Sequence, residues 1–315
     1  MKLVVLDGYT LNPGDLDWSS MESLGETKIY DRTSENEIFD RIQDADIVLT
    51  NKTPLRKELI ERCNRLRLIS VLATGYDVVD VDAASKKGIV VCNVPSYGTY
   101  SVSQFAIALL LEICCQVGHH SQMVFQGKWT KNKDWCFWDS PLTELYQKTM
   151  GIIGYGRIGQ RTGEIAKALG MHVIAYDKYP CKENIEYVDL DELCKTSDVI
   201  VLHCSLNAQT YHLINKERLK AMKKSAILIN NSRGSLIDEI ALAEALNNGI
   251  IKVAGLDVVS LEPIQKNNPL LHTKNCFITP HMSWGSYEAR KRILNSTVKN
   301  ITSFIAGHPV NQIND

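Results

Sequence analysis

The amino-acid sequence predicts an α/β protein with two doubly wound parallel sheets, each in its own domain. Two stretches of the 315-residue chain alternate short apolar runs with intervals of helix length, a pattern typical of strands that helices cover on both faces. An irregular segment, residues 127 to 146, separates the two stretches. The length is also sufficient for two domains that each bury a core.

The first stretch, residues 2 to 94, contains the apolar runs that we expect to form strands: Leu3–Leu6, Thr27–Tyr30, Ile47–Leu49, Leu68–Val71 and Ile89–Cys92. A helix is expected from Ser34 to Ile42, because Ser34 and Glu37 have the spacing of a capping box, and another from Arg56 to Arg65. The fourth strand runs into a turn of small residues at 73 to 77. Ligands of open α/β sheets bind beyond the carboxyl ends of the strands, so this turn is a candidate binding segment.

Residues 93 to 98 are expected to act as a hinge, because they include Pro95 and Gly98. A long apolar helix is predicted next, from Val102 to about Val117, with His119 and His120 at its end. The irregular segment that follows carries tryptophans among charged residues, at Trp129, Trp135 and Trp138. Exposed indoles lower solubility, so an oligomer contact is favoured over a solvent-exposed loop.

The segment from Met150 to Asp177 carries the most informative motif. An apolar strand leads into Gly154-Tyr-Gly156-Arg-Ile-Gly159, a helix follows, and a second strand runs from His172 to Tyr176. In a dinucleotide site the first glycine turns the chain, the second lets a pyrophosphate approach the backbone, and the third allows close packing of helix and strand. The free N–H groups of the helix N-terminus then bind the phosphates. The motif therefore predicts a Rossmann-type cofactor site.

Asp177 ends the second strand of this unit, where a carboxylate can accept hydrogen bonds from the ribose hydroxyls. It would also repel a 2′-phosphate, which favours NAD(H), although the neighbouring Lys178 keeps NADP(H) as an alternative. The other interpretation of Asp177 is a solvated acid at a strand end. The cofactor contacts expected from the motif are Gly154, Gly156, Arg157, Ile158, Gly159 and Asp177.

Further strands are predicted after the glycine motif, at Val199–His203, Ala226–Asn230, Lys252–Asp257 and Phe277–Thr279, with helices at Lys216–Met222 and Glu239–Asn247. Cys204, Asn231 and Ser232 follow strand ends and are further expected cofactor contacts. The last segment, Tyr287 to Ala306, is an amphipathic helix. A single helix cannot form a core alone, so it must pack on one of the two domains.

Polar residues of complementary chemistry lie just beyond the ends of the last strands: Arg233, Glu262 and His281. The guanidinium of Arg233 can bind a carboxylate and polarise an adjacent carbonyl. The imidazole of His281 can give a proton to the alkoxide that forms as a hydride attacks, and a neighbouring carboxylate such as Glu262 favours the imidazolium form. Each residue alone would be interpreted as structural or as part of a surface ion pair. Their convergence at one sheet edge predicts a catalytic triad.

Composition excludes several classes of function. The net charge is −1, the pI is about 6.7 and no basic cluster is interleaved with aromatic residues, so nucleic-acid binding is not expected. The N-terminus becomes polar at Asp7, too soon for a signal peptide, and no apolar run has the length of a membrane span. The nine cysteines include no C-x-x-C and no zinc-like grouping with histidine. We therefore expect no metal site and reduced thiols in the cytoplasm.

Together these motifs resemble the D-isomer-specific 2-hydroxyacid dehydrogenases. The resemblance covers nearly the whole chain and includes the glycine motif, Ser-Arg-Gly at 232 to 234, Glu-Pro at 262 to 263, Pro-His-Met-Ser-Trp at 280 to 284, Ala-Thr-Gly-Tyr-Asp at 73 to 77 and Asn-Val-Pro-Ser-Tyr at 93 to 97. It implies a flavodoxin-like substrate domain, residues 1 to 98 and 285 to 315, into which a Rossmann NAD domain, residues 99 to 284, is inserted, with a cleft that closes on the substrate. It also implies substrate contacts at Thr74, Gly75, Tyr97 and Arg233, an Asp257 beside the nicotinamide, and a homodimer built by the tryptophan-containing arm. One departure from the family pattern is His203-Cys204-Ser205-Leu206, where the family often has His-x-Pro-Leu.

Within the family, the sequence is most similar to the glycerate dehydrogenases, which reduce hydroxypyruvate. Glu262 argues against a formate dehydrogenase, in which glutamine is expected, and Gly75-Tyr76 supplies no cation for a phosphorylated substrate, though Lys52 or Arg56 could. The expected reaction is NADH-dependent reduction of hydroxypyruvate or glyoxylate to D-glycerate or glycolate, with hydride transfer and His/Glu acid–base catalysis. The alternatives are a D-lactate or D-3-phosphoglycerate dehydrogenase, or a protein of this fold that senses NAD(H) without catalysis.

Overall fold

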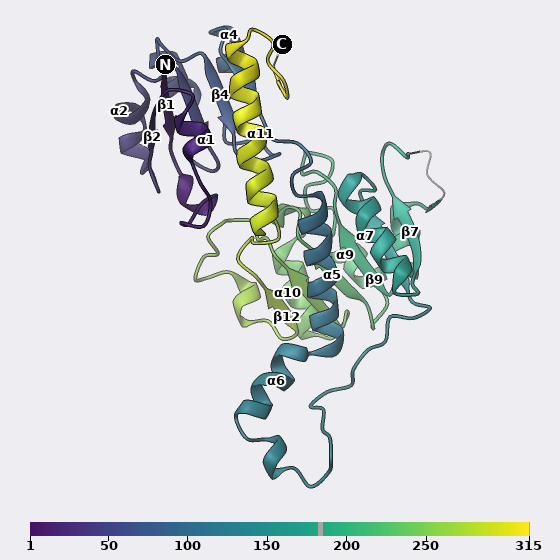
Figure 1. Cartoon of the computed structure of the whole chain (residues 1–315). Coiled ribbons are helices and arrows are strands. Elements are labelled where there is room, and N and C mark those ends of the chain that lie inside the picture. Colours follow the sequence, from purple (N-terminus) through teal and green to yellow (C-terminus); the bar gives the residue numbers. More distant parts are fainter. Residues whose placement is uncertain (182–184, 315) are drawn as a thin grey trace. The chain divides into compact units, whose positions relative to one another are not determined.

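The computed structural model describes residues 1–181 and 185–314, and the chain forms two compact units. Met1–Tyr97 and Gly285–Asp315 form the first unit, and Gly98–Trp284 form the second. Gly98 lies in the second unit, whereas the sequence analysis placed it at the end of the first. Figure 1 shows strands flanked by helices in both units.

The first unit contains a parallel five-stranded sheet with the order β2-β1-β3-β4-β5, which is the flavodoxin-like order. The strands are β1 (Lys2–Val5), β2 (Glu26–Ile29), β3 (Ile47–Thr50), β4 (Leu68–Val71) and β5 (Val90–Cys92), and the helices before the crossover to the second unit are α1 (Ser19–Glu22), α2 (Ile38–Ile42), α3 (Lys57–Arg62) and α4 (Val81–Lys86). Every residue of β3 and β4 is buried, as expected for central strands covered on both faces. The predicted capping box of Ser34 and Glu37 is present, and it precedes a short 3₁₀ turn that leads into α2.

The C-terminal helix α11 (Tyr287–Ile305) belongs to the first unit. Its Asn300 Nδ2 donates to Asn93 O at 2.8 Å. The guanidinium of Arg290, a residue only 8% exposed, donates to Leu11 O at 3.0 Å and pairs with Asp15 at 2.6 Å. The chain therefore leaves the first unit after its fifth strand and returns to complete it with its last helix.

The second unit contains a seven-stranded sheet with the order β12-β11-β10-β9-β6-β7-β8, and all its strand pairs are parallel. The strands are β6 (Thr149–Ile153), β7 (His172–Tyr176), β8 (Glu186–Tyr187), β9 (Val199–Leu202), β10 (Ile227–Asn230), β11 (Val253–Leu256) and β12 (Cys276–Ile278). The strand order reverses between β6 and β9, which is the Rossmann arrangement with one added edge strand. The predicted fold class, α/β with two doubly wound sheets, is confirmed.

Helices cover the sheet of the second unit on both faces: α5 (Thr99–Cys115), α7 (Arg157–Ala168), α8 (Leu190–Thr196), α9 (Lys216–Ala221) and α10 (Glu239–Asn247). One apolar cluster joins α8, α9 and α10 to the sheet, and a second joins α5 and α7 to it. Gly255 in β11 allows the close approach of α5, because a Cβ there would lie 2.8 Å from the side chain of Ile113.

The predicted helix from Val102 to about Val117 is wrong at its C-terminal end. Gln116 adopts a left-handed conformation with φ of 51° and separates α5 from a second helix, α6 (Val117–Phe125). His119 and His120 consequently lie near the start of α6, not at the end of α5. α6 and the segment after it project from the second unit as an arm (Figure 1).

No single helix among the described residues is long and apolar enough to cross a membrane. α5 and α6 reach that length and composition only together, and the pair is bent by 55°. In α5 the apolar side chains that include Leu110 and Ile113 are packed into the core of the second unit.

Candidate active site

The three glycines of the motif after β6, of which Gly159 lies in the first turn of α7, differ in what surrounds them. Gly154 has φ of +95°, and a Cβ there would lie 2.4 Å from Cys204 N. A Cβ on Gly159 would lie 2.2 Å from Gly154 O. A Cβ on Gly156 would meet no heavy atom within 4 Å, and the φ of −76° at this residue is one that any L-residue adopts. The fold therefore requires glycine at 154 and 159, whereas the space at Gly156 is open to a ligand.

The loop containing Gly156 fits the pyrophosphate of a dinucleotide. Gly156 is the N-cap of α7, and no side chain of the described residues caps this helix. The N–H groups of the first turn of α7 can therefore donate to an anion, and the helix dipole favours one. The loop lies between β6 and β9, where the strand order reverses and α/β sheets bind their ligands.

Asp177 is connected to the glycine loop by hydrogen bonds. Its Oδ2 accepts from Tyr155 N at 2.6 Å and its Oδ1 from Tyr179 N at 2.9 Å. The carboxylate is thus held at the end of β7, where it can still accept from ribose hydroxyls because each oxygen has two lone pairs. The ammonium of Lys178 donates to Gln209 Oε1 at 2.9 Å.

The half-buried His203 joins the loop after β9 to α7. Thr162 donates its single hydroxyl proton to Ile158 O, so the 2.9 Å contact between Thr162 Oγ1 and His203 Nε2 is a bond donated by the imidazole. Burial lowers the pKa of His203 to about 3, which keeps the ring neutral. Burial likewise raises the pKa of the Cys204 thiol to about 11.

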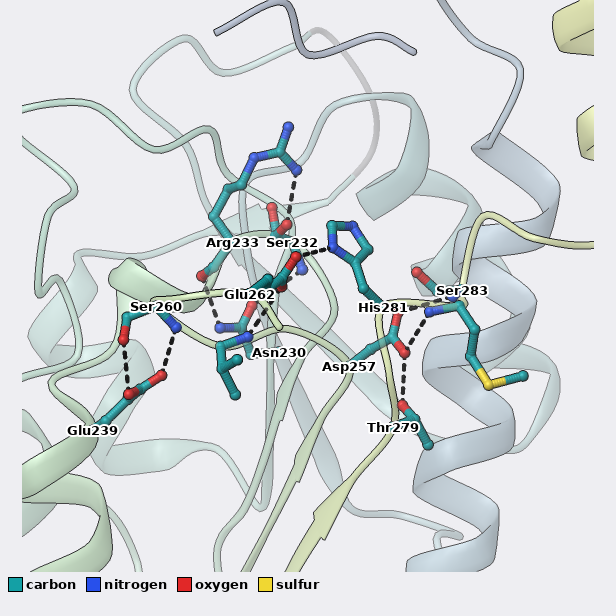
Figure 2. Close-up of polar contacts among 12 residues, drawn as sticks. Asn230, Ser232, Arg233, Glu239, Asp257, Ser260, Glu262, Thr279, His281 and Ser283 are labelled. Carbon is teal, nitrogen blue, oxygen red and sulfur yellow. Dashed lines mark hydrogen bonds and ion pairs between the residues drawn. The ribbon is translucent and has the colours of Figure 1, made fainter. Parts of the chain in front are cut away.

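Arg233 follows β10 in a turn organised by the last residue of that strand. Asn230 Nδ2 donates to Arg233 O at 2.9 Å, and Asn230 Oδ1 accepts from Ser232 N at 3.1 Å. Ser232 in turn donates its hydroxyl to Cys204 O at 2.8 Å, which connects the turns after β9 and β10. The Arg233 guanidinium makes one hydrogen bond within the turn, to Ser232 O at 2.9 Å. The guanidinium extends away from the edge of the sheet (Figure 2).

Glu262 and His281 form a direct pair. His281 Nδ1 lies 2.5 Å from Glu262 Oε2, and because a carboxylate only accepts, Nδ1 is the nitrogen that donates. Glu262 Oε1 accepts from Val259 N at 3.2 Å. The side chains are 24% and 32% exposed, so the pair is partly accessible from solvent. The remaining nitrogen, Nε2, is the one that can exchange a proton with a substrate (Figure 2).

A carboxylate that the sequence analysis missed supports the loop of Glu262. Glu239, at the start of α10, accepts from Ser260 N at 2.6 Å, from the Ser260 hydroxyl at 2.8 Å and from Asn268 Nδ2 at 2.9 Å. Its sequence context is that of an ordinary acid in the first turn of a helix. Only the position of Glu239 opposite Ser260 in the folded chain distinguishes it from such an ordinary acid (Figure 2).

The predicted substrate contacts Thr74, Gly75 and Tyr97 lie in the first unit. Thr74 donates its hydroxyl to Val94 O at 2.8 Å, which holds the turn after β4 against the segment after β5. Tyr97 O accepts from Arg292 Nε at 2.9 Å. Their role in substrate binding stays a prediction. In the second unit the predicted cofactor contact Asn231 is only 5% exposed, and its Nδ2 donates to Val102 O at 2.9 Å.

One group among the described residues could hold a metal ion, although the sequence predicts none: His119, His120 and Asp139, in the arm. Its ligand atoms already make hydrogen bonds. Asp139 accepts from Lys128 and from His119 Nε2, the latter at 2.8 Å, and these bonds lower the pKa of its carboxyl. His120 Nε2 accepts from Asp139 N at 3.2 Å. We interpret the group as a polar network that shapes the arm.

The similarity to known proteins extends over both units. A family model described as D-isomer specific 2-hydroxyacid dehydrogenase, NAD binding domain, matches residues 107–283. The chain is 60% identical to a hydroxypyruvate reductase of Blautia hydrogenotrophica over 100% of both chains. It is 40% identical to a glycerate dehydrogenase of Methylorubrum extorquens over 91% of this chain and 92% of that protein. Among solved structures, an acyclic imino acid reductase in complex with NADPH and D-Arg is similar at 34% identity with a TM-score of 0.87, covering 99% of this chain and 100% of that one.

Proposed function

The chain belongs to the D-isomer-specific 2-hydroxyacid dehydrogenases, and we propose that within this family it reduces hydroxypyruvate or glyoxylate to D-glycerate or glycolate. Membership makes it an NAD-dependent oxidoreductase that acts on 2-keto and 2-hydroxy acids. The observation that carries the chemistry is the 2.5 Å pair of His281 Nδ1 and Glu262 Oε2, which presents Nε2 for proton exchange. The choice of substrate rests on the full-length similarity to the hydroxypyruvate reductase.

The residues of the site have different roles in the proposed reaction. Arg233 binds the substrate carboxylate and polarises the adjacent carbonyl, since its guanidinium is planar and always charged. A nicotinamide cofactor held by the glycine loop and Asp177 would supply the hydride that the carbonyl carbon accepts. His281 gives a proton from Nε2 to the carbonyl oxygen, and Glu262 stabilises the imidazolium and holds the ring in one orientation. The hydride and the proton together convert the 2-keto acid to the 2-hydroxy acid, and the reverse reaction returns the proton to His281.

For the cofactor, the proposal is NADH in preference to NADPH. Asp177 places a negative charge beside the glycine loop, and hydrogen bonds to Tyr155 N and Tyr179 N hold it there. A 2′-phosphate at that position would meet like charge. The nearest cation in sequence, Lys178, pairs with Gln209.

The proposal is tested by following the loss of NADH absorbance with purified protein and a panel of hydroxypyruvate, glyoxylate, pyruvate, phosphohydroxypyruvate and an imino acid, repeated with NADPH. We expect the highest kcat/KM with hydroxypyruvate or glyoxylate and NADH. Preference for pyruvate or phosphohydroxypyruvate would reassign the substrate. Tight NADH binding without turnover of any acid would favour a protein that senses NAD(H).

We further propose a homodimer assembled through the arm. None of the side chains of α6 is buried, and Phe125 and Trp135 are 90% and 87% exposed. Apolar side chains exposed to this degree in one segment are typical of a protein–protein interface. For the compartment we propose the cytoplasm, because the cysteines of the described residues are thiols and not disulfides, a state that reducing compartments maintain.

A further inference from the structure

The segment that carries Glu262 lies on the surface of the second unit. Residues 260 to 263 are all exposed, whereas Val259, the residue before them, is 8% exposed. Exposed segments with few buried contacts change conformation at little cost in free energy. A carboxylate that must keep one orientation toward His281 therefore needs polar contacts that fix this segment.

Ser260 makes such contacts with the side chain of Glu239. Its backbone N–H donates to Glu239 Oε1 at 2.6 Å, and its hydroxyl donates to Glu239 Oε2 at 2.8 Å. Asn268 Nδ2 donates to the same Oε2 at 2.9 Å, and Asn268 is only 8% exposed. Hydrogen bonds to a charged acceptor are strong, and two of them from one residue fix the orientation of its peptide group. Figure 2 shows Glu239 and Ser260 joined by both bonds.

A backbone contact places the same peptide against the turn of Arg233. A Cβ on Gly234 would lie 1.9 Å from Val259 C and 2.2 Å from Ser260 N, distances that real Cβ atoms do not show. Glycine at 234 thus allows the two backbones to touch. Gly234 directly follows Arg233, and Glu239 lies in the first turn of the helix that comes next. One short segment, residues 233 to 239, therefore presents the guanidinium and also holds the loop of Glu262.

On this evidence, and accepting the function proposed above, we propose that Glu239 is a positioning residue for catalysis. Its carboxylate fixes the peptide of Ser260 so that Glu262 Oε2 stays 2.5 Å from His281 Nδ1. The same contact keeps the loop of Glu262 at a constant position relative to the turn of Arg233. Without Glu239 the loop would move, and Glu262 would orient the imidazole for only part of the time.

The variants that test this role are Glu239→Ala and Glu239→Gln. Alanine removes the acceptor of all three hydrogen bonds. Displacement of a catalytic group by 1 Å can lower a rate by about a hundredfold, so we expect kcat to fall by about tenfold to a hundredfold. Glutamine keeps the shape, but its NH₂ group cannot accept, so one N–H donor loses its acceptor. We expect it to lower kcat by about threefold to tenfold, and it carries the test if the alanine variant does not fold.

The Kd for NADH, measured by fluorescence, should not change in either variant. An unchanged kcat would overturn the proposal. A loss of NADH binding as large as the loss of kcat would also overturn it, because it would show that the whole unit is disturbed.

A double-mutant cycle with Glu262→Ala decides whether Glu239 acts through Glu262. Effects of residues that act as one unit are not additive. In the Glu262→Ala background we expect Glu239→Ala to lower kcat further by less than about threefold. A larger further loss would mean that Glu239 acts independently of Glu262, and it would overturn the proposal.

A second readout needs no turnover. The bond to Glu262 keeps the proton of the neutral imidazole on Nδ1, and nitrogen NMR of labelled histidine reports which ring nitrogen carries it. The signals of His281 are identified by their absence in His281→Asn. In Glu239→Ala they should move toward those of a mixture of tautomers, and unchanged signals would overturn the positioning role. If the wild-type protein reduces no 2-keto acid, the proposed function fails, and these signals still decide the role of Glu239.

The matched control is Glu244→Ala. Glu244 is a carboxylate of the same helix, α10, and it pairs at 2.9 Å with Lys216, which lies in α9. Its kcat and its His281 signals should equal those of the wild type. A loss of kcat as large as that of Glu239→Ala would mean that any change in α10 disturbs the site, and it would overturn the proposal.

Discussion

Alanine substitutions in the glycine loop separate what the fold needs from what the cofactor needs. In Gly156→Ala the new Cβ meets no protein atom within 4 Å, and the backbone conformation suits alanine. Alanine is a weaker N-cap than glycine, but it also reduces the entropy of the unfolded chain, and the two effects are each below about 1 kcal/mol and of opposite sign. We therefore expect the melting temperature without cofactor to stay within about 3 °C of wild type.

The same variant should bind NADH poorly. The added methyl group occupies the space in which a pyrophosphate would approach the N-terminus of α7. Losing one hydrogen bond to a charged group costs about 1.5–3 kcal/mol. This corresponds to a rise in the Kd for NADH of about tenfold to a hundredfold.

The neighbouring glycines should behave in the opposite way. In Gly159→Ala the Cβ would lie 2.2 Å from Gly154 O, an overlap that forces α7 away from the loop. Overpacking of this kind costs about 1–3 kcal/mol. In Gly154→Ala the new Cβ would lie 2.4 Å from Cys204 N. The alanine would also have to adopt the left-handed conformation of this position, with φ of +95°. The left-handed conformation alone costs about 1–2 kcal/mol. Each kcal/mol lowers the melting temperature by about 2–4 °C, so we expect clear destabilisation in both variants even without cofactor.

Differential scanning calorimetry without cofactor and fluorescence titration with NADH measure the two effects separately. The wild-type protein serves as the reference in both measurements. Wild-type affinity for NADH in Gly156→Ala would refute the reasoning, because it would mean that no phosphate contacts the backbone there. A large loss of stability in the same variant would also refute it, since the structure leaves that space open.

The remaining predictions concern catalysis, cofactor choice, pH and assembly. His281→Asn should lower kcat by about 10²–10⁴-fold with NADH affinity retained, and equal loss of NADH binding would make the residue structural. Asp177→Ala should reduce the preference for NADH over NADPH by about tenfold or more, which kcat/KM with the two cofactors measures; an unchanged ratio would remove the residue from the ribose site. Burial lowers the pKa of His203 to about 3, whereas an unfolded histidine has about 6.5, so the unfolded state binds the proton first as the pH falls. The neutral histidine makes its full contribution to the free energy of unfolding above about pH 6.5. As the pH falls toward 3, that contribution decreases by up to about 1.4 kcal/mol per pH unit. Urea unfolding of His203→Gln should therefore show a weaker pH dependence in that range, and an equal slope would contradict the assignment. Trp135→Asp should convert the proposed dimer to monomer in light scattering, and an unchanged mass would place the interface elsewhere.

The sequence predicted most of the second unit because its signals are local. The strand at His172–Tyr176 has the predicted bounds, since apolar residues in that run must be buried on both faces. The short helices α4 and α8 and the two-residue strand β8 were missed, because segments of fewer than two helical turns give no clear periodicity. The break at Gln116 was missed for a different reason. A left-handed glutamine has no sequence signal, and tertiary contacts decide where the helix ends.

The sequence by itself determined the longer strands and helices in their order, the glycine loop and the positions of Arg233, Glu262 and His281 after strand ends. These features depend on short-range properties, namely apolar periodicity, the conformational freedom of glycine and the rule that ligands bind at the carboxyl ends of parallel strands. The tertiary structure decided which glycines the fold itself requires and which carboxylate supports the loop of Glu262. Asp257 and Glu239 accept hydrogen bonds from segments more than twenty positions away in sequence, which the pairing of β11 with β12 and the packing of α10 bring close to them. A carboxylate acquires such a role from its neighbours in space, which local sequence patterns do not contain.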